Sequence, residues 1–279
     1  MNFPKFWAKG SHEDFSCWRW SNDSLAEAES LAKAAAQKLA ERFANKGGLA
    51  NSRYGYADRP MREAILREFK DWAGNLTAAI TRNSYGCLVL NTARAMFVDV
   101  DLPAPKSSGG GLFGKLFGKK TAPPSNDAET QALAKAEGWT QKNPGWGWRV
   151  YRTRAGLRLL ATHELFEPDV ALTEAAFDAL AADPLYRRLC KNQKCFRARL
   201  TPKPWRCDVE KPPSRWPWAD AKAESHFQQW EKKYISACGE FATCNLIATF
   251  GSTQIHADIQ PIVQVHDEAT RAESKLALA

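Results

Sequence analysis

Long apolar runs are missing from this chain of 279 residues. No stretch of about twenty apolar residues is present, so we expect no membrane span. The segment Met1 to Lys5 has neither the charged nor the apolar region of a secretory signal, and we expect a cytoplasmic protein. The 7 cysteines form no Cys-x-x-Cys pair, which favours free thiols in a reducing compartment.

Several catalytic signatures are also absent. The chain has no Gly-x-x-x-x-Gly-Lys-Ser/Thr loop, no Gly-x-Ser-x-Gly elbow and no His-Glu-x-x-His segment. These absences argue against a P-loop NTPase, a serine hydrolase and a zinc protease. Cys190, Cys195, Cys207 and His226 do not have the spacing of a zinc knuckle or ribbon, which argues against a zinc site.

Positive charge and tryptophan are abundant instead. The formal net charge is +8, which fits a polyanionic partner such as a nucleotide or nucleic acid. The 11 tryptophans fit two interpretations. They fill the core of an irregular fold, or one or two exposed rings stack on bases.

Two aspartates end the apolar run Ala95 to Leu102. Side chains alternate along a strand, so Asp99 and Asp101 are predicted to share one face. Paired carboxylates suit Mg²⁺ or Mn²⁺, and their charges repel each other unless a cation neutralises them. The pair is therefore either a divalent-metal site or a strand end that runs out into solvent.

The pattern of elements predicts one α+β domain with a mixed or antiparallel sheet flanked by helices. This single domain is predicted to consist of an N-terminal part (1–77), a core (78–206) and a C-terminal extension (207–279). Within the core, the Gly- and Lys-rich residues 104–126 are predicted to be a disordered insertion. A docking segment for a membrane or a partner is the alternative for that stretch.

The first half is predicted to begin with a hairpin, residues 3–8 and 15–20, that turns at Gly10-Ser11. The other predicted elements up to the aspartates are helices over 25–45 and 61–72 and a strand over 78–91 that pairs with the aspartate strand. The second half is predicted to contain helices over 127–137, 173–182, 185–190, 227–250 and 268–279, and strands over 148–153, 157–162, 195–201 and 253–266.

Basic residues recur on the predicted strands. Arg197 and Arg199 alternate with apolar residues, and Arg158 alternates with Leu157 and Leu159, so we expect Arg158 to point away from the core. Guanidinium and ammonium groups beside metal-bound carboxylates are suited to bind phosphates. The candidate phosphate ligands are Arg82, Arg152, Arg154, Arg158, Arg197, Arg199 and Lys203. The segment Arg82 to Gly86 either supplies Arg82 and Tyr85 to a phosphate or base site or is the bulged start of a strand.

The order of these motifs resembles a known family. A strand ending Asp-x-Asp is followed by a Thr-x-x-Gly-x-basic hairpin (Thr153, Gly156, Arg158), a helix, and an Arg-bearing strand leading to Pro-x-Pro. Over residues 78–206 this is similar to archaeo-eukaryotic primases and primase-polymerases. The resemblance implies an RNA-recognition-like sheet, metal ligands at Asp99 and Asp101, and a nucleotide motif in which Arg158 replaces the family's histidine.

The resemblance implies a metal-dependent enzyme that transfers nucleotidyl or phosphoryl groups on nucleotides, DNA or RNA. The alternative is a non-catalytic nucleic-acid-binding protein on the same sheet, which the replaced histidine favours. His163 and His266 are further candidates for the site. His266 and Asp267 either bind metal together or, at the end of the last strand, cap the final helix.

Overall fold

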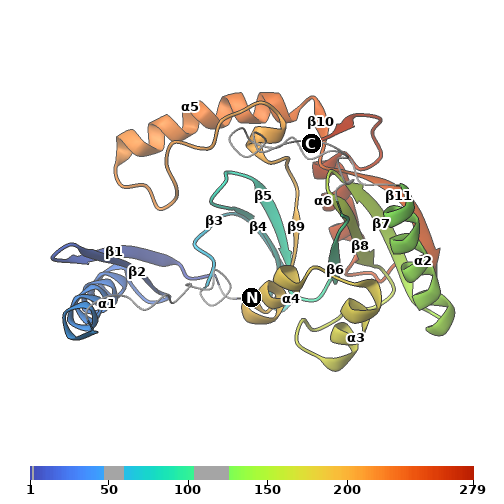
Figure 1. Ribbon diagram of the computed structural model, residues 1–279, viewed down its shortest axis with the longest axis horizontal. Helices are drawn as coiled ribbons and strands as arrows, with labels where there is room; N and C mark the ends of the chain where they lie inside the picture. The colour runs from blue at the N-terminus through green and yellow to red at the C-terminus, as the bar shows by residue number, and fades with distance from the viewer. Residues whose placement is uncertain (2, 47–59, 104–125) are drawn as a thin grey trace, which may run out of the picture.

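Two four-stranded sheets form the centre of the protein in the computed structural model, which describes residues 1, 3–46, 60–103 and 126–279 (Figure 1). Sheet I has the order β3 (Ala64–Lys70), β4 (Leu76–Arg82), β5 (Leu88–Thr92) and β9 (Phe196–Arg199). Sheet II has the order β11 (Cys244–Gly251), β7 (Gly147–Thr153), β8 (Gly156–Ala161) and β6 (Phe97–Asp101). All neighbouring strands in both sheets are antiparallel, and helices flank them, so the predicted α+β class is confirmed.

An N-terminal hairpin, β1 (Phe6–His12) and β2 (Phe15–Ser21), packs against α1 (Leu25–Lys46) to one side of the sheets (Figure 1). Gly10 allows this packing, because a Cβ there would lie 2.3 Å from the backbone nitrogen of Lys33. The hairpin and the helix were both predicted. The predicted turn at Gly10-Ser11 is wrong, since Gly10 pairs with Cys17 inside the ladder and the chain turns at Glu13.

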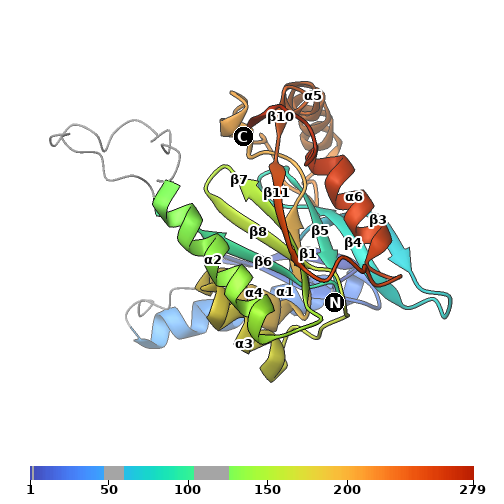
Figure 2. The ribbon, with the colours of Figure 1, turned by 90° about the vertical axis from the view of Figure 1, so that its right-hand side faces the viewer.

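Helices and short segments complete the described chain. α2 (Asn126–Lys142) and α6 (Gln260–Thr270) lie along sheet II (Figure 2), and Ala136 of α2 and Val263 of α6 belong to its core. The other elements are α3 (Ala171–Leu180), α4 (Pro184–Gln193), the 3-10 helix η3 (Pro204–Arg206), α5 (Ala221–Cys238), β10 (Phe241–Ala242) and β12 (Ala277–Leu278).

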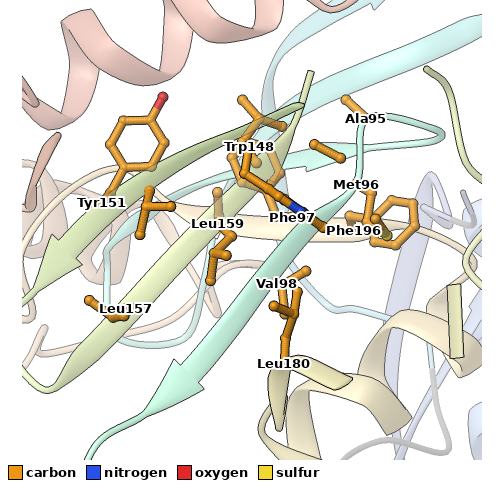
Figure 3. Packing of buried hydrophobic residues seen from close by; sticks show 14 of the residues in the cluster. Ala95, Met96, Phe97, Val98, Trp148, Tyr151, Leu157, Leu159, Leu180 and Phe196 are labelled. Atoms are coloured by element: carbon orange, nitrogen blue, oxygen red, sulfur yellow. The ribbon is translucent and has the colours of Figure 1, made fainter. Parts of the chain in front are cut away.

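The main core lies around sheet II. Every residue of β8 is buried, and Phe97 and Val98 of β6 are fully buried beside it. Figure 3 shows Phe97 and Val98 packed with Leu159 of β8, and Leu180 of α3 lies next to Val98. Because both faces of the central strands are covered, any polar side chain on them is removed from water and needs an internal partner.

Several predicted elements in the first half are wrong. Residues 61–72 contain β3 instead of a helix, because pairing with β4 outweighs the helix-forming composition. Residues 78–91 contain two strands, since the Asn83 side chain accepts hydrogen bonds from the Tyr85 and Cys87 amides and turns the chain. The aspartate strand β6 pairs with β8 and not with the strand before it.

The C-terminal predictions also need correction. The helix predicted over 227–250 ends at Cys238, and the alternating residues after it form β11. The strand predicted over 253–266 is wrong, because this segment leads into α6. Pro261 lies in the first turn of α6, where its missing N–H costs no hydrogen bond. The terminal helix predicted over 268–279 is wrong, because this segment ends in β12, which pairs with β10. The predicted insertion at 104–126 lies outside the described residues except for Asn126.

Candidate functional site

Asp99 and Arg158 meet across the β6–β8 ladder, where they are direct register partners. Arg158 Nε donates a hydrogen bond to Asp99 Oδ1 at 3.1 Å. Arg158 Nη1 donates a second one, of 2.9 Å, to the backbone oxygen of Arg199 in sheet I. The side chain of Arg158 is 2% exposed, so the expectation that it points away from the core is wrong. Alternation along β8 fails as a guide because both faces of the strand are covered.

A buried polar chain continues inward from Arg158. Its Nη1 lies 3.4 Å from His266 Nε2, and His266 Nδ1 lies 2.8 Å from Asp267 Oδ1. Because a guanidinium can only donate, Nε2 is the acceptor and the ring proton sits on Nδ1, donated to Asp267. Arg149 then pairs with Asp267 and donates to the hydroxyl of Tyr151. His266 is thus held as a neutral imidazole inside α6, and not at the end of a strand.

Acidification is expected to destabilise the protein through His266. Burial lowers its pKa to about 4, and the neighbouring Arg158 charge adds to this. Between pH 6.5 and 4 the unfolded chain binds a proton that the folded chain does not, so stability falls as the pH falls. The free energy of unfolding from urea titrations should be about 2 kcal/mol lower at about pH 5 than at pH 7. His266→Gln should remove this part of the slope, and an unchanged slope would contradict the assignment.

Asp101 lies at the exposed end of β6 among charges of both signs. Partial burial and the neighbouring Asp183 and Asp99 charges raise its pKa, whereas Lys203 and Arg206 oppose the rise. The cations are crowded in turn. Burial, followed by repulsion from Arg199, lowers the pKa of Arg206 to about 10 and lowers that of Lys203. The cluster holds more cationic side chains than carboxylates to neutralise them. Such an excess of positive charge favours the binding of an added anion.

A cleft of about 570 Å³ lies between the N-terminal hairpin and sheet I, and Asp99 forms part of its wall. Its cationic lining residues are Arg62, Arg197, Arg199 and Arg215, and its aromatic lining residues are Trp7, Trp18 and Tyr186. Arg199 Nε is buried without a hydrogen-bond partner. An unsatisfied buried donor at a cleft wall is costly unless a ligand supplies the acceptor.

Other predicted phosphate ligands already have carboxylate partners. Arg197 Nη2 donates to both oxygens of buried Glu63, at 2.9 and 3.0 Å. Arg82 pairs with Glu231 of α5, and Arg152 Nε lies 2.7 Å from Glu129 of α2. Arg82 and Arg152 are not among the residues that line the cleft. The structure therefore brings together Asp99, Asp101, Arg158, Arg199 and Lys203 and places Arg82 and Arg152 apart from them.

The residues of the predicted nucleotide motif shape the β7–β8 turn. Thr153 Oγ1 accepts from the Gly156 amide at 3.1 Å, and Gly156 packs directly on β6. Arg154 lies in the same turn, where its charge acts on Arg206. His163 follows the far end of β8 and packs against Trp146 at 4.7 Å between ring centroids. Because Asp99 pairs near the start of β8, His163 does not belong to the site.

Sequence reasoning missed several residues of the site. Arg62, Glu63 and Arg215 line the cleft but lie outside any recognisable motif. Asp183 was detectable, since Asp-Pro before an amphipathic helix is an N-cap signal, and its carboxylate accepts from the Tyr186 amide at 2.7 Å. The Asp183 amide also donates to the Asp99 backbone oxygen at 2.9 Å, which fixes α4 beside β6.

Comparison with known proteins gives no relative. No protein-family model, curated protein or solved structure matches the chain. Within the described residues, no three His, Cys, Asp or Glu side chains form a group that could hold a metal ion. In the same part of the chain, no helix is both long and apolar enough to cross a membrane.

Proposed function

We propose that the cleft binds the phosphates of a nucleotide or of DNA or RNA, and that the protein is a non-catalytic binder on a primase-like sheet. The observation that carries this proposal is the unpartnered Nε of Arg199 in the wall of a cleft with four arginines. Guanidinium groups bind phosphate oxygens through paired, charge-assisted hydrogen bonds. Trp7 and Trp18 of the hairpin line the same cleft, and the Arg62 guanidinium lies over the Trp18 ring, 4.0 Å from its centre.

The Asp99–Arg158 pair favours binding over catalysis. A metal at Asp99 would have to compete with a buried guanidinium that already neutralises this carboxylate at 3.1 Å. The arginine occupies the position where the primase resemblance expects a histidine. A fixed cation can hold the sheet together, but it cannot exchange ligands during a reaction as a metal ion can.

Loss of the Arg199 side chain is expected to weaken phosphate binding. Arg199→Gln should raise the dissociation constant for a fluorescent nucleoside triphosphate by about tenfold or more, because charge-assisted hydrogen bonds are lost. The measurement is fluorescence anisotropy at fixed salt concentration. Arg188→Gln is the matched control, because Arg188 is exposed on α4 and outside the cleft. Equal weakening by both variants would point to general charge and would contradict the cleft assignment.

Metal-dependent nucleotidyl or phosphoryl transfer of the primase-polymerase type is the second candidate. Asp101 favours it, because burial and then the charges of Asp183 and Asp99 raise its pKa, and a divalent cation would relieve the repulsion between these carboxylates. In this alternative sheet II takes the part of the family's RNA-recognition-like sheet. Asp99 and Asp101 would hold Mg²⁺ or Mn²⁺, which would offset charge on the phosphates.

A melting experiment separates the two candidates. If the second holds, Mn²⁺ at about a hundred times its dissociation constant adds about 2.7 kcal/mol of stability, and Asp101→Asn abolishes the gain. Asp101 is the better residue to change, since Asp99 also holds Arg158. A melting temperature that does not respond to Mn²⁺, together with intact nucleotide binding, leaves the non-catalytic binder.

A further inference from the structure

Two exposed aromatic rings form a small surface beside the cleft. Trp205 of η3 is 44% exposed and Tyr85 of the β4–β5 turn is 40% exposed. Their ring centroids are 5.2 Å apart and their planes meet at 85°, so the edge of one ring supports the other. We call this pair the Tyr85–Trp205 platform. Large rings left in water on two neighbouring elements indicate a contact surface.

Lysines surround the platform. Lys203 Nζ lies 5.6 Å and Lys211 Nζ 5.9 Å from the centre of the Trp205 ring. Burial and then the charges of Arg199 and Arg206 lower the pKa of Lys203. An exposed aromatic ring with two cations over it matches an aromatic ligand that carries negative charge.

Both rings are mounted on well-fixed turns. The Asn83 side chain accepts from the Tyr85 amide at 2.9 Å and from the Cys87 amide at 3.1 Å. On the other side, the Arg206 and Cys207 amides donate to the Lys203 and Pro204 oxygens, which closes η3 around Trp205. Because these backbones are already ordered, a ligand that stacks on the rings loses little free energy in fixing them.

The platform continues the cleft along the surface. Asn83 and Ser84 line the cleft, and Tyr85 is the next residue in the same turn. Lys203 precedes Trp205 by two residues, and its charge acts on Asp101 at the end of β6. A polymer with phosphates at Arg199 can therefore extend past the β4–β5 turn and reach the two rings.

We propose that the Tyr85–Trp205 platform stacks the bases of a single-stranded nucleic acid whose adjoining phosphates lie in the cleft. This inference rests on the proposed function, because it extends the same binding path. Bases in a duplex are already stacked on their neighbours, so only an unpaired strand can place its bases on these rings. The two lysines then attract the backbone on either side of the stacked base.

The test compares two fluorescein-labelled probes by fluorescence anisotropy. Labelled thymidine triphosphate reports on the cleft, and a labelled single-stranded oligothymidylate of about 12 nucleotides is long enough to reach the platform. Trp205→Ala should weaken oligothymidylate binding by about tenfold or more and leave triphosphate binding unchanged. Trp205→Phe should retain most of the affinity, because a ring remains. Trp72→Ala is the matched control, since Trp72 is 99% exposed on the β3–β4 turn, away from the cleft.

The outcomes distinguish this inference from the proposed function. If the triphosphate binds but Trp205→Ala leaves oligothymidylate affinity unchanged, the platform is wrong and the cleft assignment stands. If oligothymidylate binding depends on Trp205 but the triphosphate does not bind, the platform stands and the cleft assignment fails. A blunt duplex that binds as tightly as the single strand overturns the platform, and no binding of either probe overturns both.

Discussion

Replacing Arg158 with alanine is expected to lower the free energy of unfolding by about 4 kcal/mol. The change removes one of the largest fully buried side chains of the core. It also leaves Asp99, the Arg199 backbone oxygen and His266 Nε2 without the donor that now joins them. Urea unfolding followed by tryptophan fluorescence measures the loss, provided that the slope with urea is unchanged.

The control for this change is Arg188→Ala, which removes an exposed arginine and should stay within about 0.5 kcal/mol of the wild type. A double-mutant cycle then isolates the pair. Asp99→Asn should cost less in the Arg158→Ala background than in the wild type, because the carboxylate has already lost its partner. Equal costs in both backgrounds would show that the two side chains do not interact and would remove the basis of the buried network.

Replacing Gly156 with alanine is expected to cost about 3 kcal/mol of stability. The added Cβ would lie 2.0 Å from the backbone oxygen of Val100 and 3.1 Å from the Cα of Asp101. Neither atom belongs to a side chain that can rotate away, so β6 and β8 must separate where Asp101 pairs with Gly156. Thermal and urea unfolding both measure this change.

Gly138 provides the matched control for Gly156. It lies inside α2, and nothing is within 4 Å of an added Cβ. Gly138→Ala should therefore raise stability by about 0.5–1 kcal/mol, since alanine loses less backbone freedom in a helix. A Gly156→Ala protein as stable as the wild type would mean that β6 and β8 do not approach as closely as the ladder requires.

Local patterns predicted those elements whose partners are near in sequence. The capping residue Ser24 and the alanine-rich segment after it predicted α1, and the Glu27 amide indeed binds the Ser24 hydroxyl at 3.1 Å. The hairpin of β7 and β8 was predicted because its turn is short and follows alternating residues. The positions of β3 and α6 were missed, since strand pairing and the placement of Pro261 decide them.

The candidate site was predicted only in part. Strand alternation placed Asp99 and Asp101 correctly at the end of β6, and it placed Arg199 beside a buried Ala198. It could not place Arg158, because a strand covered on both faces has no solvent side. The division into two sheets was also missed, since it arises from β6 pairing with β8 across a long sequence separation. Arg62 and Arg215 reach the cleft through tertiary folding alone.

The bond from Arg158 to the Arg199 backbone oxygen joins the interior of sheet II to the wall of the cleft. Arg199 therefore joins two environments: its carbonyl oxygen accepts from Arg158 in the interior, while its side chain lines the cleft. Substitutions at His266, which touches no ligand-accessible surface, should then alter ligand affinity by shifting the anchor. In a mutational scan, substitutions at such interior positions would change ligand affinity as well as the stability of the protein.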